Sequence, residues 1–165
     1  MEAGGEAVSN FRVAVSGVPG TGKTTLSLLI SRSGYRIIDL NVEAGKAGCL
    51  HEDEVDIGCL RERIRTDGPV IMDGHYSHLL DPYCVIITEC SPDLLETRLH
   101  ERGYDRAKIM VNLDVLLTDA IYDEASEYVP RNRIMRISTE NGIKEKDFSL
   151  IMDFIKRMER KSDGT

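Results

Sequence analysis

The segment GVPGTGKT, residues 17–24, restricts the fold of this chain more than any other part of its sequence. It matches the pattern G-x-x-x-x-G-K-[ST] at every fixed position. An apolar run of strand length, 11–16, precedes it, and a helical run, 26–33, follows it and ends at Gly34, a predicted C-cap. A strand that passes through such a loop into a helix predicts an α/β fold with a phosphate-binding site. The alternative, a glycine-rich turn with a chance lysine, does not account for this context.

The residue types of this loop predict how it would hold a nucleotide. Glycines let the backbone wrap tightly and turn its N–H groups inward, and the helix that begins near Lys23 adds the positive end of its dipole. We expect Lys23 to contact the β- and γ-phosphates, the Thr24 hydroxyl to bind magnesium and the Thr25 hydroxyl to face the α-phosphate. The predicted ATP-binding residues of the loop are Gly17, Gly20, Gly22, Lys23, Thr24 and Thr25.

Apolar runs of strand length alternate with runs of helical spacing along the rest of the chain. Further strands are predicted at 35–40, 70–73, 83–88 and 133–138, and further helices at 56–66, 91–101, 106–128 and 144–160. The helix 106–128 is predicted from a stripe of apolar residues, namely Met110, Leu113, Leu117, Ile121 and Ala125. Residues 41–54 show no period and are predicted to form a loop or an ordered insertion. This order predicts a P-loop NTPase fold, a three-layer sandwich around a five-stranded parallel sheet, in one domain, 11–161, after a flexible tail, 1–10.

Composition narrows the function classes. The formal charge of −7 argues against a broad nucleic-acid-binding face, which needs a basic stripe. No apolar stretch is long enough to span a bilayer, and residues 1–10 lack the features of a secretory signal, so we expect a cytoplasmic protein. The four cysteines form no C-x-x-C pair and are expected to be reduced thiols, with a disulfide as the alternative that a hyperthermophilic source would favour: Cys49, Cys59, Cys84 and Cys90.

A carboxylate ends the apolar run Val70-Ile71-Met72-Asp73, as in a Walker-B segment. The carboxyl end of this strand would open on the same edge of a parallel sheet as the phosphate loop, so Asp73 could hold magnesium directly or through water. His75 follows on the loop and could orient a water molecule or contact phosphate. A strand-ending cap for Asp73 and a plain surface position for His75 are the alternatives. Together with His78 and Asp81 they also resemble a metal cluster, although nothing in the sequence fixes its geometry.

Arginines follow in the region predicted to cover the nucleotide. Arg98 and Arg102 are four residues apart in a predicted helix and therefore share one face. Arg106 follows after Gly103, a possible hinge. Mobile arginines that close over a γ-phosphate neutralise charge in phosphoryl transfer. The alternative is that Arg98 and Arg102 form surface ion pairs with Glu96, Glu101 or Asp105.

These motifs occur in an order that resembles a known family. GVPGTGKTT, the Asp73-Gly74-His75 sequence and Glu101-Arg102-Gly103-Tyr104 are similar to the adenylate kinase isoenzyme 6 family, also called the coilin-interacting nuclear ATPase family. The similarity runs over about 11–127 and includes Lys108, Asn112 and the sequence YDEA at 122–125. An ordinary adenylate kinase shares the phosphate loop and would not be expected to carry the D-x-H signature.

The resemblance implies a nucleoside monophosphate (NMP) kinase-like fold with an NMP segment at about 39–52 and a lid at about 101–111. It implies that Lys23, Asp73, His75 and Arg102 serve catalysis and that Arg102 also contacts ATP, with magnesium held by Thr24 and Asp73. The implied NMP-binding residues are Asp39, Asn41 and Lys46, and the lid cations are Arg98, Arg106 and Lys108. It also implies ATPase activity, and a role in late maturation of the small ribosomal subunit through transient binding of one ribosomal protein.

The chain departs from this family in its NMP segment. The family usually offers an arginine to the AMP phosphate, whereas no arginine lies between Arg36 and Arg61 here, and Lys46 is the only cation in 42–60. Because a dianionic phosphate prefers a bidentate guanidinium to a lone ammonium, we expect weak NMP affinity.

Three functions therefore remain: an NMP kinase that acts on ATP and AMP, an ATPase switch for a ribosomal protein, and another small-molecule kinase. An acidic protein would suit a basic ribosomal protein. The cations of 156–161 favour the end of the last helix, with a nuclear signal as the alternative that applies only to a eukaryotic source.

Overall fold

The structure is a computed structural model that describes residues 10–164, so the first nine residues of the predicted tail lie outside the described part. Five parallel strands form the central sheet in the order β2-β5-β1-β6-β7. They are β1 (Arg12–Ser16), β2 (Arg36–Asp39), β5 (Val70–Asp73), β6 (Cys84–Glu89) and β7 (Ile134–Ser138). The predicted fold class, a P-loop NTPase sandwich of the NMP kinase type, is confirmed.

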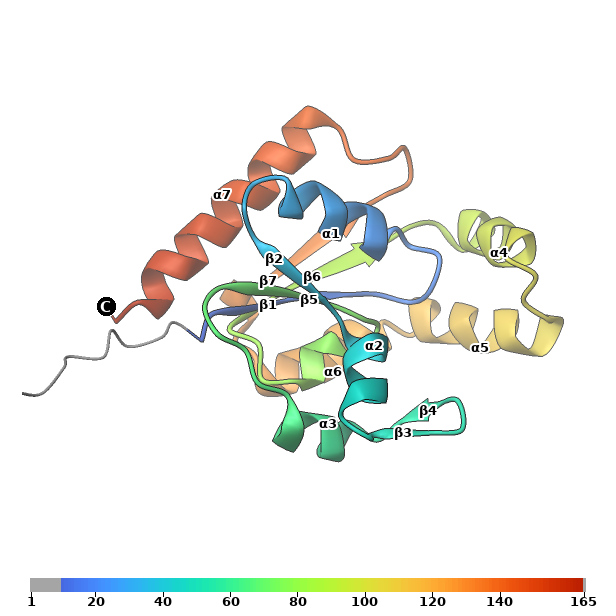
Figure 1. The fold of residues 1–165 in the computed structure, drawn as a ribbon. Coiled ribbons are helices and arrows are strands. Elements are labelled where there is room, and N and C mark those ends of the chain that lie inside the picture. The colour runs from blue at the N-terminus through green and yellow to red at the C-terminus, as the bar shows by residue number, and fades with distance from the viewer. Residues whose placement is uncertain (1–9, 165) are drawn as a thin grey trace, which may run out of the picture.

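Helices cover both faces of the sheet (Figure 1). On one face lie α1 (Lys23–Ser31) and α7 (Glu145–Ser162), and on the other lie α2 (Leu40–Lys46), α3 (Ile57–Arg63) and α6 (Ala120–Tyr128). Two more helices, α4 (Pro92–Glu101) and α5 (Arg106–Leu117), extend beyond the carboxyl ends of the strands. Short 3₁₀ turns are η1 (Ser77–Leu79) and η2 (Arg131–Arg133). No helix in residues 10–164 is long and apolar enough to cross a membrane.

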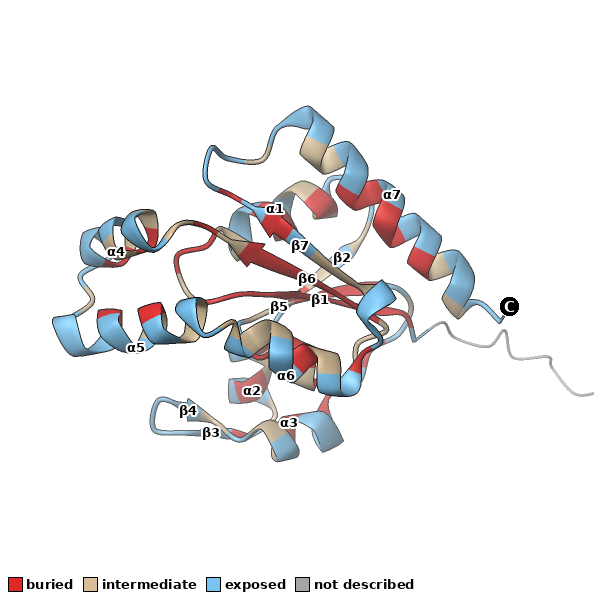
Figure 2. Ribbon diagram, turned by 180° about the vertical axis from the view of Figure 1, so that it is seen from behind, coloured by how far each residue is buried: buried red, intermediate tan, exposed pale blue. Residues whose placement is uncertain are grey.

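The strands alternate their side chains between two hydrophobic clusters, which is why short apolar runs are buried on both faces (Figure 2). In β1, Val13 and Val15 pack toward α1 and α7, whereas Ala14 packs toward the opposite layer. A third cluster joins α4 and α5 to the phosphate loop through Val18, Leu99 and other apolar side chains. The packing therefore fixes the sheet and the loop as one body.

The segment predicted as a loop or ordered insertion at 41–54 contains regular structure. Helix α2 is followed by an antiparallel hairpin of β3 (Leu50–His51) and β4 (Glu54–Val55). A disulfide joins Cys49, before the hairpin, to Cys59 in α3. The expectation of reduced thiols is therefore wrong for this pair, because the short hairpin folds the chain back and brings together two cysteines whose spacing is not a recognised motif. Cys84 and Cys90 are free, buried thiols.

The predicted helix 106–128 is two helices. Asp119 lies between α5 and α6 with a φ of 58° and interrupts the helical backbone. The predicted stripe is buried at Leu113 and Ala125, whereas Met110 is 42% exposed and Leu117 is 65% exposed. Each helix keeps the helical spacing of its apolar residues, but the break at Asp119 changes the direction in which they face. The apolar side of α5 packs against α4, and that of α6 packs against the sheet.

Candidate active site

The phosphate loop joins β1 to α1 and takes its shape from its own backbone and from β6. Gly17 has a φ of 143°, and a Cβ atom there would lie 2.5 Å from the Thr88 hydroxyl oxygen. The Thr21 hydroxyl donates to the Val18 carbonyl over 2.6 Å and lies 2.8 Å from the Thr88 hydroxyl. Only glycine fits at the start of the loop, and the threonine pair fixes the turn that follows.

The amino end of α1 faces into this loop. Gly22, the N-cap, has a left-handed φ of 89° and no side chain that could cap the helix. The Lys23 ammonium donates to the Val18 carbonyl over 3.0 Å, which places the charge inside the curve of the loop. Burial lowers the pKa of Lys23 to about 8, against the opposing effect of Asp73. A half-buried cation beside the amino end of a helix is suited to bind an anion.

A cleft of about 270 Å³ lies beside the loop and collects most of the residues predicted to contact ATP. It is lined by Gly20, Gly22, Thr25, Arg98, Arg102, Thr139, Gly142 and Ile143. Arg98 donates to the Gly20 carbonyl over 3.0 Å and to the Thr139 carbonyl over 3.1 Å. Arg98 therefore contacts the loop in this structure, whereas Arg102 is exposed at the cleft.

Asp73 ends β5 next to the phosphate loop, since Val15 of β1 pairs with Asp73 in the parallel register. The Thr24 side chain lies near this carboxylate. Desolvation raises the pKa of Asp73, while Lys23 and Thr24 act in the opposite direction. A hydroxyl and a carboxylate near each other at the end of the loop are oxygen ligands of the kind that magnesium prefers, so these residues fit such an ion.

A second cleft, of about 580 Å³, lies on the side of α2 and the hairpin. Its lining residues are Asn41, Leu50, Asp53, Glu54, Val55, Ile57, His75 and Tyr76. Of the three residues predicted to bind the monophosphate, only Asn41 belongs to this lining. Asp39 caps α2 by accepting from two backbone N–H groups, and the Lys46 ammonium is 3.8 Å from the Glu43 carboxylate.

His75 joins this second cleft to the Walker-B strand. Its ring packs edge-on against Tyr76, with 4.9 Å between ring centroids. His75 is exposed, as the alternative of a surface position predicted. Desolvation, Lys23 and His78 all lower the pKa of His75, which favours the neutral imidazole. A neutral imidazole at this position can accept a proton or orient a hydroxyl group.

The two remaining lid cations lie away from both clefts. Arg106 is 3.3 Å from the Glu96 carboxylate, and the Lys108 ammonium lies 4.3 Å from the centre of the Tyr104 ring. Glu96 thus pairs with Arg106, and in the part of the chain that the structure describes no ion pair joins Arg98 or Arg102 to an acidic side chain, so the surface ion pairs considered for those two arginines are not found. Among residues 10–164 there is also no group of three or more histidine, cysteine or acidic side chains placed to hold a metal ion, so the alternative of a zinc or iron cluster is not supported.

Sequence reasoning missed the residues that support the phosphate loop from distant strands. The Thr139 hydroxyl donates to the Thr21 carbonyl over 2.7 Å, and Thr88 meets Thr21 from β6. Both follow from the sheet order, because Thr88 and Thr139 lie at the carboxyl ends of β6 and β7. A polar residue at the end of an otherwise apolar run was the available signal in each case.

Comparisons with known proteins identify a family and relatives of this chain. A family model described as "AAA domain" matches residues 13–129. A protein of Thermoplasma acidophilum described as "Putative adenylate kinase" is 45% identical over 126 residues, which cover 76% of this chain and 85% of the relative. A protein of Methanocaldococcus jannaschii with the same description is 31% identical over 164 residues, which cover 92% of this chain and 90% of the relative.

Solved structures share the fold. TT1252 from Thermus thermophilus superposes with a TM-score of 0.54 at 12% identity, and the match covers 89% of this chain and 96% of that chain. A gluconokinase from Sinorhizobium meliloti superposes with a TM-score of 0.50 at 16% identity, and the match covers 92% of each chain. At these identities the likeness concerns the architecture alone.

Proposed function

We propose that this chain, which belongs to the AAA domain family and to an adenylate-kinase-like group of P-loop proteins with archaeal members, transfers the γ-phosphoryl group of ATP to AMP or a related monophosphate. The observation that carries this proposal is the pair of clefts at one edge of the sheet. The first, which we call the donor cleft, is lined by the phosphate loop and Arg102. The second, which we call the acceptor cleft, is lined by residues that include Asn41 and His75. Phosphoryl transfer depends on holding donor and acceptor close together, and two clefts at the same edge of the sheet suit that task.

Magnesium is the cofactor proposed for this reaction. Thr24 and Asp73 would hold it, directly or through water, because both supply oxygen atoms at the end of the phosphate loop. When bound, the ion would supply positive charge to the β- and γ-phosphate oxygens.

The chain's own residues account for the rest of the mechanism. The loop N–H groups and the Lys23 ammonium would bind the β- and γ-phosphates in the concave side of the loop. Arg102, exposed at the donor cleft, would approach the phosphates and offset charge that spreads during transfer. His75, with its lowered pKa, would orient the attacking oxygen.

The acceptor cleft favours weak binding of the monophosphate. Asp53 and Glu54 add negative charge to its lining, and no arginine belongs to it. Lys46 is 70% exposed and pairs with Glu43. Electrostatic repulsion therefore opposes a dianionic acceptor unless Lys46 leaves Glu43 and binds the incoming phosphate.

This account predicts that Lys46→Ala weakens AMP phosphorylation and leaves ATP hydrolysis intact. The KM for AMP should rise about tenfold, as expected for the loss of one exposed charge-assisted contact. Lys156→Ala, which removes an exposed lysine from α7, is the matched control. Equal loss of both activities, or no effect on either, would show that Lys46 does not bind the acceptor phosphate.

ATP hydrolysis is the second candidate, and His75 favours it. The imidazole of His75, two residues after the Walker-B carboxylate, would orient water as well as a nucleotide acceptor. In this version the nucleotide state would control a transient complex with a basic ribosomal protein, which the acidic charge of −7 would attract. That partner and a role in small-subunit maturation rest on the family resemblance.

A nucleotide panel with and without magnesium tests these functions. ADP formed only when AMP is present supports the kinase, whereas phosphate released without AMP supports the ATPase. Lys23→Met should abolish both, since it removes the cation of the loop. Turnover that requires a sugar or another small alcohol would instead identify a different small-molecule kinase.

A further inference from the structure

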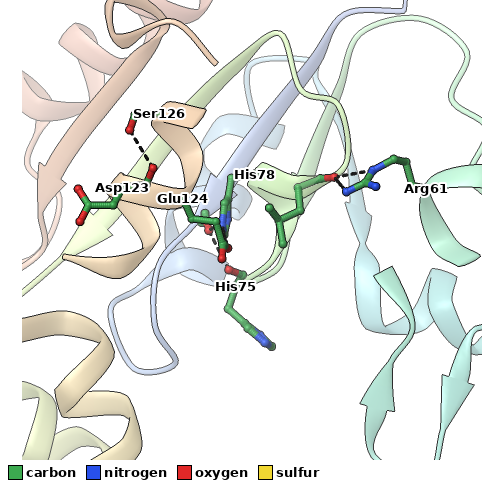
Figure 3. A network of polar contacts seen from close by, with 8 residues as sticks. Arg61, His75, His78, Asp123, Glu124 and Ser126 are labelled. Atoms are coloured by element: carbon green, nitrogen blue, oxygen red, sulfur yellow. Dashed lines mark hydrogen bonds and ion pairs between the residues drawn. The ribbon is translucent and has the colours of Figure 1, made fainter. Parts of the chain in front are cut away.

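A buried histidine outside the predicted catalytic set joins three elements of the site. His78 lies in η1 and its side chain is 2% exposed. Its Nδ1 atom is 2.8 Å from the Ser16 hydroxyl at the end of β1, and its Nε2 atom is 2.6 Å from the Glu124 carboxylate of α6. Figure 3 shows this network with the His75 ring pointing away from it. Both ring nitrogens are thus engaged by groups far apart in the chain.

The same network reaches His75 through the main chain. Ser16, just before the phosphate loop, donates its hydroxyl proton to the His75 carbonyl over 3.0 Å. The Ser77 hydroxyl donates to the Val15 carbonyl over 3.0 Å. Two side-chain hydrogen bonds therefore tie the loop that carries His75 to the last residues of β1.

Counting protons defines the state of His78 that satisfies every contact. The Glu124 carboxylate accepts only, so Nε2 must donate to it. The Ser16 hydroxyl has one proton, which goes to the His75 carbonyl, so Nδ1 must donate to the Ser16 oxygen. All three hydrogen bonds coexist only when His78 carries a proton on each nitrogen. If Nδ1 loses its proton, the Ser16 hydroxyl turns to Nδ1 and the His75 carbonyl loses its hydrogen bond.

The charges around His78 decide how often that state is populated. Burial is the larger effect and lowers the pKa of His78 below its ordinary value, while the Glu124 carboxylate opposes this shift, so the doubly protonated ring is favoured only as the pH falls. Arg12 of β1 and Arg61 of α3 also reach this loop, where they donate to the Leu80 and Leu79 carbonyls. His75 lies on the same loop. Glu124 is therefore the acidic group that favours the protonated imidazole among the described residues around it.

We propose that His78 is a positioning residue for phosphoryl transfer, which holds His75 in place beside the phosphate loop through its paired contacts with Ser16 and Glu124. This rests on the proposed function. Because α6 follows α5, whose first turn belongs to the predicted lid, Glu124 also connects the lid helices to the Walker-B loop. Glu124, which supplies the negative charge, thus lies in α6, whereas His75, the residue held in place, lies on the loop after β5.

Glu124→Gln tests the proposal because it keeps the shape of the side chain and removes its charge. We expect kcat to fall about tenfold while the KM for ATP stays within about twofold, as for a group that acts on the transition state only. As the pH is raised, the activity of the variant should begin to fall at a lower pH than that of the parent. Without the Glu124 charge, His78 loses its proton more readily. Glu127→Gln, on the exposed surface of the same helix, should leave both unchanged.

Two readouts separate this inference from the proposed function. The His78 ring resonances, followed by NMR against pH, should give a lower pKa in Glu124→Gln whether or not the protein is active. Ser16→Ala should lower kcat by a similar factor, and the double variant should lose little more, because both changes break one network. If the parent shows no transfer or hydrolysis, the proposed function fails. If the parent is active and Glu124→Gln keeps its kcat and pH profile in a folded protein, the role of His78 fails.

Discussion

Reduction of the Cys49–Cys59 disulfide should lower the stability of this protein by an amount that the structure allows us to calculate. The bridge closes a loop with a sequence separation of 10 residues. The chain-entropy relation gives about 2.7 kcal/mol at 25 °C for a loop of this length. For a domain of this size, that corresponds to a fall of about 5–11 °C in Tm. The loop should respond with the whole domain, because Cys49 and Leu60 belong to the main hydrophobic cluster.

The assay is thermal unfolding of oxidised and fully reduced protein, with the redox state verified by mass spectrometry. A Cys49→Ala/Cys59→Ala variant should be insensitive to the reductant, which separates the bridge from Cys84 and Cys90. Identical Tm values for oxidised and reduced protein would refute the calculation.

The same perturbation has a functional counterpart. The hairpin enclosed by the bridge supplies Leu50, Asp53, Glu54 and Val55 to the acceptor cleft. Reduction should therefore raise the KM for the monophosphate and leave ATP hydrolysis unchanged. An equal effect on both would show that the bridge supports the whole domain and not this cleft in particular.

Three further predictions concern the phosphate loop. Gly17→Ala should destabilise the protein by about 2–4 kcal/mol in urea unfolding, whereas Gly34→Ala, which meets no atom within 4 Å, should cost about 1 kcal/mol. Lys23→Met should raise the stability of the nucleotide-free protein at pH 7, because burial makes the charged form unfavourable below a folded pKa of about 8; the gain should vanish above the unfolded value of 10.5. Arg98→Ala should weaken ATP binding about tenfold, since two carbonyls beside the donor cleft lose their donor, whereas Arg106→Ala should have no effect.

The sheet and the phosphate loop could be predicted from sequence because each depends on local patterns. Strand 70–73 and its terminal Asp73 were predicted with their observed bounds. The loop signature specifies backbone shape through glycines, and the alternation of strands and helices specifies a parallel sheet. These signals need no knowledge of what packs against them.

The acceptor side could not be predicted, because it depends on contacts between distant segments. Asp39 resembled a ligand but caps α2, and the break at Asp119 follows a run of helical spacing without a glycine or proline to mark it. His78 showed no sign of its partner, since Glu124 is 46 residues away. A surface position and a buried network are indistinguishable in a single sequence when the partner comes from another layer of the fold.

The supports of the phosphate loop have a consequence for how the chain acquires its activity during synthesis. Thr21 meets Thr88, 67 residues later, and its carbonyl binds Thr139, 118 residues later. A nascent chain that has emerged only as far as the Walker-B strand contains the whole phosphate loop. It lacks Thr88 and Thr139, which hold that loop in shape. ATP would therefore recognise the polypeptide only after nearly all of it has left the ribosome, and it could not act as a template for the first half of folding.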